Sequence, residues 1–136
     1  MTAQTARTTC VVDTHALLWV IAGSTLLSLR VKELLRGAGT AAVIPAIVLA
    51  EVAHLHWRGR ATVSVERVLS YVRSAARTVV VPVDAEVVRR MPPGLEIHDA
   101  IIVATAVLLR DQGHTNVVIA TRDAAIKECG AVPVVW

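Results

Sequence analysis

Aromatic side chains are scarce in this sequence, because its 136 residues include no Phe, one Tyr and three Trp. The core must therefore be built mainly from Val, Ala, Leu and Ile, and valine-rich runs favour buried β-strands. So few rings also argue against a protein that holds single-stranded nucleic acid on a platform of several exposed aromatics. Any contact with nucleic acid should mainly involve the phosphate backbone.

Cysteine is also rare, since only Cys10 and Cys129 are present and no Cys-x-x-Cys or Cys/His metal spacing occurs. We expect both to be small buried apolar residues rather than a disulfide framework. The sequence also lacks an uninterrupted apolar run of about 18 residues, which a membrane span requires. The stretch 14–29 comes nearest, but Gly23 and Ser24 break it, which argues against a signal peptide as well. These absences favour a reducing cytoplasm and no membrane partner.

The residues that are present indicate a folded protein. Hydrophobic residues make up 54% of the chain and the mean hydropathy is +0.58, which excludes intrinsic disorder. The length suits one ordinary domain with one substantial core. We therefore predict a single domain over residues 1–136, with residues 1–8 as a flexible tail.

Arginine dominates the basic residues. Twelve of the fourteen are Arg, and the formal net charge is +3. Planar guanidinium groups bind phosphate through paired hydrogen bonds, so this bias is compatible with a nucleic-acid ligand, although it is a weak signal by itself. The candidates for contact with a nucleic-acid backbone are Arg58, Arg60, Arg89, Arg90 and Arg122.

Short apolar runs alternate with helical patterns along the chain, which is typical of βαβ units. Strands are predicted at 9–13, 40–44, 78–82, 116–120 and 131–135. Helices are predicted at 14–22, 28–37, 46–57, 63–77, 84–91 and 97–112, with a short helix after Asp123 and with Ser28, Ser64 and Asp84 as N-caps. The alternation predicts an α/β fold, a three-layer α/β/α sandwich with a central parallel sheet.

Four of the eleven acidic residues stand in apolar surroundings where burial is expected. They are Asp13 in CVVDTHALLW, Glu51 in AIVLAEVAHL, Asp99 in IHDAIIVATA and Asp123 in VVIATRDAAI. Removing an ionised carboxylate from water is unfavourable unless a partner compensates, and no four matching Lys or Arg residues accompany these acids. A shared cation is the simplest explanation.

The predicted fold can bring these acids together, because ligands of an open parallel sheet bind beyond the carboxyl ends of its strands. Asp13 closes the first predicted strand and Asp123 follows the fourth. Glu51 lies in the second turn of the helix after the second strand, and Asp99 lies near the start of the helix at 97–112. Since 38, 48 and 24 residues separate the four in turn, only the tertiary fold could unite them.

Electrostatics predicts what such a site would hold. At about 5 Å and an effective dielectric of about 20, each carboxylate pair repels by roughly 3 kcal/mol. Oxygen ligands suit Mg²⁺ or Mn²⁺, whereas structural zinc prefers Cys or His. We predict one or two Mg²⁺ or Mn²⁺ ions, which could activate water and stabilise charge on a phosphodiester. Hydrolysis of nucleic acid is the expected reaction.

Each acid also has an explanation that needs no ligand. Asp13 and Asp123 could cap the helices that follow them, Asp99 could complement a helix dipole, and Glu51 could be an ordinary exposed helix residue. Together these explanations need four coincidences at one sheet edge. His15 and His98, beside two of the acids, are weaker candidates for orienting substrate.

Other chemistries fit less well. Glu51 and His54 form a Glu-x-x-His pair, as in di-iron helical bundles, but a second such motif is missing. The chain has no glycine-rich dinucleotide turn, P-loop or Gly-x-Ser-x-Gly elbow. A phospho-acceptor pocket of the receiver type is a closer rival, but Asp13 lacks an acidic neighbour and Lys127 is the only late Lys.

The four acidic segments resemble those of the PIN-domain ribonucleases, specifically the VapC-type toxins of toxin–antitoxin pairs. VVDTHALLW is similar to the family's first strand and first metal-binding Asp, and VLAEVAH to the helix with its Glu. IHDAIIVATA and IATRD resemble the third and fourth acidic motifs, and VPVVW the last strand. The resemblance covers nearly the whole chain and implies a PIN-like fold.

The resemblance also implies a function and a set of site residues. It implies a Mg²⁺-dependent endoribonuclease that acts as a toxin, forms a homodimer and is inhibited by a VapB-like antitoxin. Trp19 would belong to the antitoxin or dimer surface, or else to the core. A PIN nuclease outside a toxin system, and a PIN-like module that binds RNA or protein without cleavage, are the alternatives. The implied metal ligands are Asp13, Glu51, Asp99 and Asp123, supported by Thr14 and Thr121, with Arg122 near phosphate.

Overall fold

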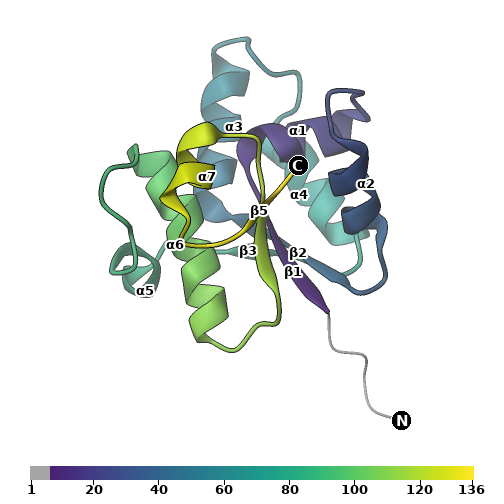
Figure 1. The fold of residues 1–136 in the computed structure, drawn as a ribbon. Helices are drawn as coiled ribbons and strands as arrows, with labels where there is room; N and C mark the ends of the chain where they lie inside the picture. Colours follow the sequence, from purple (N-terminus) through teal and green to yellow (C-terminus); the bar gives the residue numbers. More distant parts are fainter. Residues whose placement is uncertain (1–6) are drawn as a thin grey trace.

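Five parallel strands form the central sheet of the computed structural model, which describes residues 7–136. Their order across the sheet is β3-β2-β1-β4-β5 (Figure 1). The central strand β1 pairs with β2 and β4, so that Val11 lies opposite both Val43 and Ile119. The strands are β1 (Thr8–Val12), β2 (Thr40–Pro45), β3 (Thr78–Val81), β4 (Val117–Ala120) and β5 (Val134–Val135).

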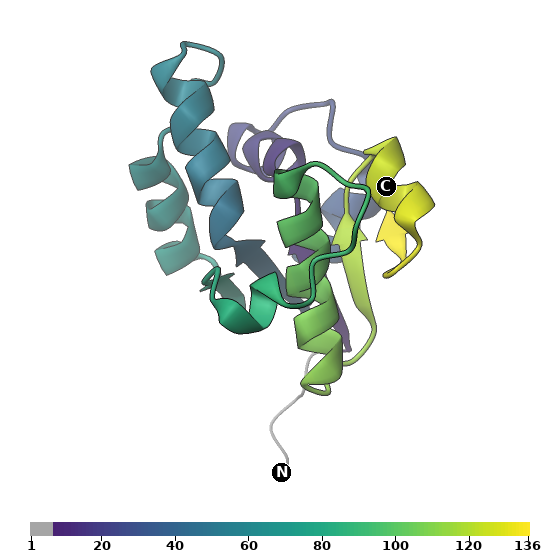
Figure 2. The ribbon, with the colours of Figure 1, turned by 90° about the vertical axis from the view of Figure 1, so that its left-hand side faces the viewer.

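Seven helices surround this sheet within the described residues. In Figure 1, α5, α6 and α7 lie on one side of the strands, and α2 and α4 lie on the other. Figure 2 shows α6 in front of the sheet, with α3 rising above the ends of the strands. This arrangement confirms the predicted three-layer α/β/α sandwich. The helices are α1 (Thr14–Ala22), α2 (Leu29–Arg36), α3 (Ala46–Trp57), α4 (Val65–Ser74), α5 (Ala85–Val88), α6 (Ile97–Asp111) and α7 (Ala124–Cys129).

Side-chain caps begin several of these helices at the residues predicted from the sequence. Ser28 accepts a hydrogen bond from the backbone N–H of Val31 at 3.1 Å, which begins α2. Ser64 and Asp84 begin α4 and α5 in the same way. Each cap satisfies an amide that has no partner within the first helical turn.

Several predicted boundaries were wrong. The helix expected at 63–77 ends at Ser74, because the backbone leaves the helical conformation there. Ala75 is extended, and Arg77 is in the left-handed region with φ +58°. The helix expected at 84–91 is only the four-residue α5. The strand expected at 131–135 shrinks to two residues, since Pro133 has no N–H for the ladder.

The predicted tail also needs correction at its inner end. Thr8, which was assigned to the tail, is the first residue of β1, and the N–H of Arg7 already donates to the carbonyl of Gly39 at 2.7 Å. Residues 1–6 of the predicted tail lie outside the described residues.

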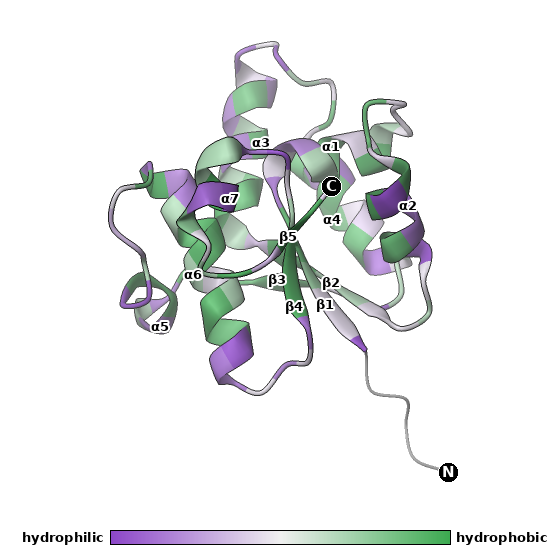
Figure 3. Ribbon diagram, viewed as in Figure 1, coloured by the Kyte–Doolittle hydropathy of each residue, from purple (hydrophilic) through white to green (hydrophobic). Residues whose placement is uncertain are grey.

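The core lies between the sheet and its helices and is built from the aliphatic residues that the composition predicts. Val11, Ile44 and Ile119 on adjacent strands are fully buried. Figure 3 shows β4 and the middle of α6 as apolar, whereas α6 ends in a hydrophilic turn. Cys10 is buried, and burial raises the pKa of its thiol to about 12, while Cys129 is half-buried. Within residues 7–136, no helix is both long and apolar enough for a membrane crossing.

Candidate functional site

The first acid of the site follows the central strand directly. Asp13 comes after β1 and is the N-cap of α1, since its Oδ1 accepts the N–H of Ala16 at 2.8 Å. The capping role considered for Asp13 is therefore real. The cap bond uses Oδ1, and the side chain of Thr121 also hydrogen-bonds this carboxylate.

Asp123 repeats this arrangement beyond the neighbouring strand β4. Its Oδ1 accepts the N–H of Ile126 at 3.0 Å and caps α7. The backbone N–H of Asp123 donates to the hydroxyl of Thr121 at 3.0 Å. Thr121 is buried, so it supports the loop from beneath rather than facing the site.

Glu51 reaches the same edge from α3. The hydroxyl of Thr14 donates to its Oε2 at 2.8 Å, which links the start of α1 to the second turn of α3 across 37 residues of sequence. Thr14 is buried and Glu51 is half-buried. Glu51 is therefore oriented by a specific partner and is not the ordinary exposed helix residue of the simpler explanation.

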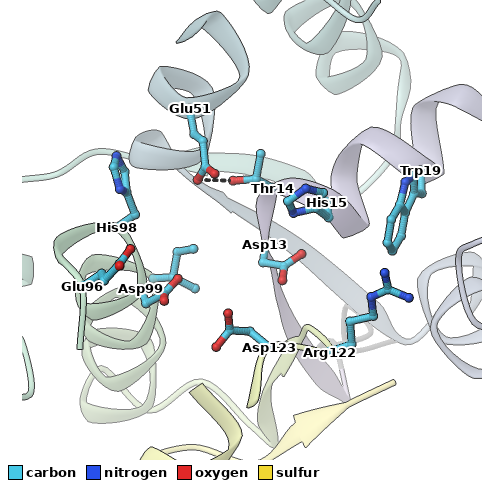
Figure 4. A pocket seen from close by; sticks show the side chains of 11 residues that line it. Asp13, Thr14, His15, Trp19, Glu51, Glu96, His98, Asp99, Arg122 and Asp123 are labelled. Carbon is cyan, nitrogen blue, oxygen red and sulfur yellow. Dashed lines mark hydrogen bonds between the residues drawn. The ribbon is translucent and has the colours of Figure 1, made fainter. Parts of the chain in front are cut away.

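Asp99 lies in the first turn of α6, where a negative charge also complements the helix dipole. It is half-buried, and no hydrogen bond to its side chain is present among the described residues. Figure 4 shows its carboxylate pointing into the space that Asp13 and Asp123 also face, with Glu51 entering from α3.

These acids line one cavity of about 410 Å³ at the carboxyl edge of the sheet. Five of the lining side chains are acidic, because Glu96 joins the four predicted acids. Arg122 is the only Lys or Arg that lines this cavity among the described residues. The lining residues are Asp13, Thr14, His15, Trp19, Glu51, Glu96, His98, Asp99, Ile102, Arg122 and Asp123.

The gathered charge affects protonation. Burial raises the pKa of Asp99, and the nearby charges of Asp123, Glu96, Glu51 and Asp13 raise it further. Burial also raises the pKa of Asp13, although hydrogen bonds from the Thr121 side chain and the Ala16 backbone partly oppose this. Ionising Asp13 and Asp99 is therefore less favourable in this place than in water.

The carboxylates would suit a divalent cation that binds oxygen. Within residues 7–136, no three Asp, Glu, His or Cys side chains form a ready-made metal cluster. Mg²⁺ commonly keeps several waters and takes only one or two carboxylates directly, so widely spaced acids can share it through those waters. The carboxylates of Asp13, Glu51, Asp99 and Asp123, which line the same cavity, fit this mode of binding.

Arg122 lies at the border of the cavity against an aromatic cluster. Its guanidinium group is 4.8 Å from the centroid of the Trp19 ring, which also packs edge-on against Trp136 at 5.6 Å. Cation–π contact holds the positive charge beside the acids rather than among them. Trp19 is half-buried and lines the cavity, so its side chain lies partly in the core and partly at the surface.

The other predicted basic contacts divide into two groups. Arg89 and Arg90 do not line the cavity and instead form ion pairs with Glu86, and Arg90 also with Asp111. Arg58 and Arg60 are exposed just beyond the end of α3. Only the second pair is free of acidic partners among the described residues.

Sequence reasoning missed Glu96. It precedes α6 and lies one helical turn before Asp99, so the spacing in GLEIHDA could have revealed it. It was not predicted because the segment MPPGL before it is not the apolar run that marked the other acids. The weak candidates His15 and His98 do line the cavity.

Comparison with known proteins gives a family and a fold. A sequence model described as the PIN domain matches residues 10–131. A chain from the crystal structure of VapBC2 from Rickettsia felis, bound to a DNA fragment from their promoter, superposes with a TM-score of 0.62 at 12% identity. The match covers 93% of this chain and 97% of that one.

A second structure is less similar. The PIN domain endonuclease Utp24 has a TM-score of 0.49 at 19% identity, covering 97% of this chain and 86% of that one. No match was found among curated protein sequences.

Proposed function

This chain belongs to the PIN domain family, whose members are generally nucleases, and we propose that it is a metal-dependent endoribonuclease. The observation that supports this activity is the convergence of carboxylates from α3, α6 and the ends of β1 and β4 on one cavity. Hydrogen bonds within the protein account for the position of a carboxylate oxygen in Asp13, Glu51 and Asp123. They do not explain why these side chains line the same cavity.

We propose that Asp13, Glu51, Asp99 and Asp123 hold one or two Mg²⁺ ions, with Mn²⁺ as a substitute. Bound there, the cation would supply a nucleophilic water and stabilise negative charge on the phosphodiester. Thr14 orients Glu51, and Thr121 supports Asp123 and hydrogen-bonds Asp13. Arg122 is positioned to meet a phosphate next to the one that is cut, because it is the only Lys or Arg lining the cavity among the described residues.

The biological setting is the finer part of the proposal. We infer that the protein is the toxin of a type II toxin–antitoxin pair, works in the cytoplasm as a homodimer and is inhibited by a VapB-like antitoxin. Its four acidic motifs support this setting, and the VapBC2 structure shares its fold. Trp19, beside the cavity, is the proposed contact for an antitoxin segment that blocks the site.

The test is cleavage of total cellular RNA by the purified protein with Mg²⁺ or Mn²⁺, and with EDTA. Asp13→Asn is the control variant, because Asn keeps the N-cap of α1 while removing a charged oxygen. We expect discrete fragments that require the metal and that the variant does not produce. Absence of cleavage with every metal by the folded protein would instead favour the non-cleaving binding module.

A further inference from the structure

The outer end of α3 and the turn after it form a projecting tip, residues 54–61, which we call the α3 tip. Trp57 is 81% exposed, more than any other large hydrophobic side chain among the described residues. His54, His56, Arg58 and Arg60 around it are exposed as well. Figures 1 and 2 both show this tip extending beyond the rest of the molecule. Trp57 adds almost nothing to the core, so its ring is free to contact a partner.

Hydrogen bonds hold the α3 tip in a defined shape. Gly59 takes the left-handed conformation, with φ +70°, and its N–H donates to the carbonyl of His56 at 3.0 Å. The N–H of Arg60 donates to the carbonyl of Leu55 at 2.8 Å. His56 Nδ1 lies 3.0 Å from the carbonyl of Ala61 and must be the donor, because a carbonyl only accepts. A preorganised tip loses little conformational freedom on binding.

The α3 tip extends from the same helix that brings Glu51 to the cavity. Arg58 follows Glu51 by seven residues, which is two helical turns, so both lie on one face of the helix axis about 10 Å apart. The segment 52–65 contains no acidic residue. A continuous strand bound at the cavity could therefore pass from Glu51 to the positive charges of the tip.

The cavity alone attracts a polyanion poorly. Among the described residues, five acidic side chains and one Arg line it, so Arg side chains outside the cavity would add to the affinity for RNA. Arg89 and Arg90 are already engaged by Glu86 and Asp111, whereas Arg58 and Arg60 have no acidic partner among the described residues. Two guanidinium groups beside an exposed indole supply the phosphate contacts and the stacking surface that a single-stranded polyanion requires.

We propose that the α3 tip binds a single-stranded segment of the RNA substrate next to the cleavage site. Arg58 and Arg60 contact phosphates, and the Trp57 ring stacks on one base. Most of the contact is then to the backbone, as the scarcity of aromatic residues predicts, and a single ring supplies the stacking. The inference rests on the proposed function for its substrate class.

The test measures binding of a fluorescein-labelled, unstructured RNA of about 15 nucleotides by fluorescence anisotropy, a length near the upper end of single-strand site sizes. All proteins carry Asp99→Asn, so that RNA is not consumed. The two test variants are Trp57→Ala and the double change Arg58→Glu with Arg60→Glu. The matched control is Arg30→Glu with Arg36→Glu on α2, which alters the net charge equally at exposed helical positions.

We expect Trp57→Ala to weaken binding at least about fivefold, the lower end for loss of one base–aromatic stack. The Arg58/Arg60 variant should bind about tenfold more weakly, with a salt-dependence slope smaller by about 1.4, as two lost phosphate contacts on a single strand predict. The α2 control variant should lose less affinity for RNA than either tip variant. With Asp99 restored, the test variants should show a higher KM and an unchanged kcat.

Two results separate this inference from the proposed function. If the Asp99→Asn protein binds RNA and the parent protein cleaves it, but both tip variants match the control, then the tip is not an RNA contact. If no form binds or cleaves RNA, the proposed function fails and the inference fails with it. A change of oligomeric state by light scattering for Trp57→Ala, at unchanged RNA affinity, would make the tip a protein contact and overturn the inference.

Discussion

Two regions of this protein hold acidic residues in contrasting surroundings. Around α5 and the end of α6, Glu86 lies 2.8 Å from Arg90, and Arg90 lies 2.9 Å from Asp111. At the cavity, by contrast, no acid has a Lys or Arg ion-pair partner among the described residues. The first region neutralises its carboxylates internally, whereas the second keeps them for a charge from outside.

The pKa shifts have opposite signs in the two regions. Hydrogen bonding from Arg90 lowers the pKa of Glu86, while burial and neighbouring acids raise the pKa of Asp99. A carboxylate in a stabilised pair contributes to folding, and a carboxylate crowded by others opposes it. This difference indicates that the cavity is maintained for function at some expense in stability.

The largest expected effect comes from Asp99→Asn, which removes one charge from the crowded region. We expect cleavage to fall by at least about a hundredfold, the upper end of the losses for residues that only support a metal ligand. The metal-free variant should be as stable as the parent or more stable, because carboxylate repulsion is relieved. Initial cleavage rates and thermal unfolding in EDTA measure the two effects.

The matched control for Asp99→Asn comes from the paired region and is Asp111→Asn. This change removes the same charge from an exposed carboxylate that Arg90 contacts. It should leave cleavage unchanged, because Asp111 does not line the cavity. Equal losses of activity in both variants would contradict the division between the two regions.

A smaller effect is expected from Thr14→Val, which keeps the shape of the side chain but removes the hydroxyl that orients Glu51. The cleavage rate should fall about tenfold to a hundredfold, as when the hydrogen-bond partner of a metal ligand is lost. Thr14→Ser, which restores the hydroxyl, should recover most of the rate. Full activity of the Val variant would show that Glu51 needs no partner.

The smallest expected effect is on the pH dependence of stability in EDTA. Because the folded-state pKa of Asp99 is raised, Asp99 binds its proton more readily in the folded protein than in the unfolded chain, and its contribution to stability should rise as the pH is lowered from neutral through the folded-state pKa. The pKa of Glu86 is lowered, so its contribution is present above its ordinary value and disappears as pH falls through the folded value.

Unfolding midpoints across this pH range, compared between the parent and each variant, isolate these two contributions. As the pH is lowered, the unfolding midpoint of the parent protein should rise relative to that of Asp99→Asn. Over the same range, it should fall relative to that of Glu86→Gln. Shifts of the same sign for both pairs would refute the contrast between the regions.

Much of the site could be predicted from local sequence. Asp13 and Asp123 each follow an apolar strand, and in a parallel sheet the ends of such strands share one edge. The structure places them in one cavity with Glu51 and Asp99, as expected, and their role as metal ligands stays a prediction. Glu96 was missed because it follows the segment MPPGL rather than an apolar run.

Contacts between side chains distant in sequence could not be predicted. Arg90 was a candidate for RNA, but the packing of α5 on α6 places it beside Asp111, 21 residues away. Arg122 was assigned to phosphate without any sign that Trp19 would hold it from one side. The Glu86–Arg90 pair, four residues apart in a predicted helix, could have been read from local sequence, but the Arg90–Asp111 pair could not.

The sequence by itself determined the alternation of strands and helices, the caps at Ser28, Ser64 and Asp84, and the acids that end up at the sheet edge. These depend on periodicity and on hydrogen bonds within a few residues. Only the tertiary structure decided that Thr14 binds Glu51, that Arg90 meets Asp111 and how far the α3 tip projects. Those outcomes depend on the packing of segments far apart in the chain, where the angle of one helix against another sets which charges meet.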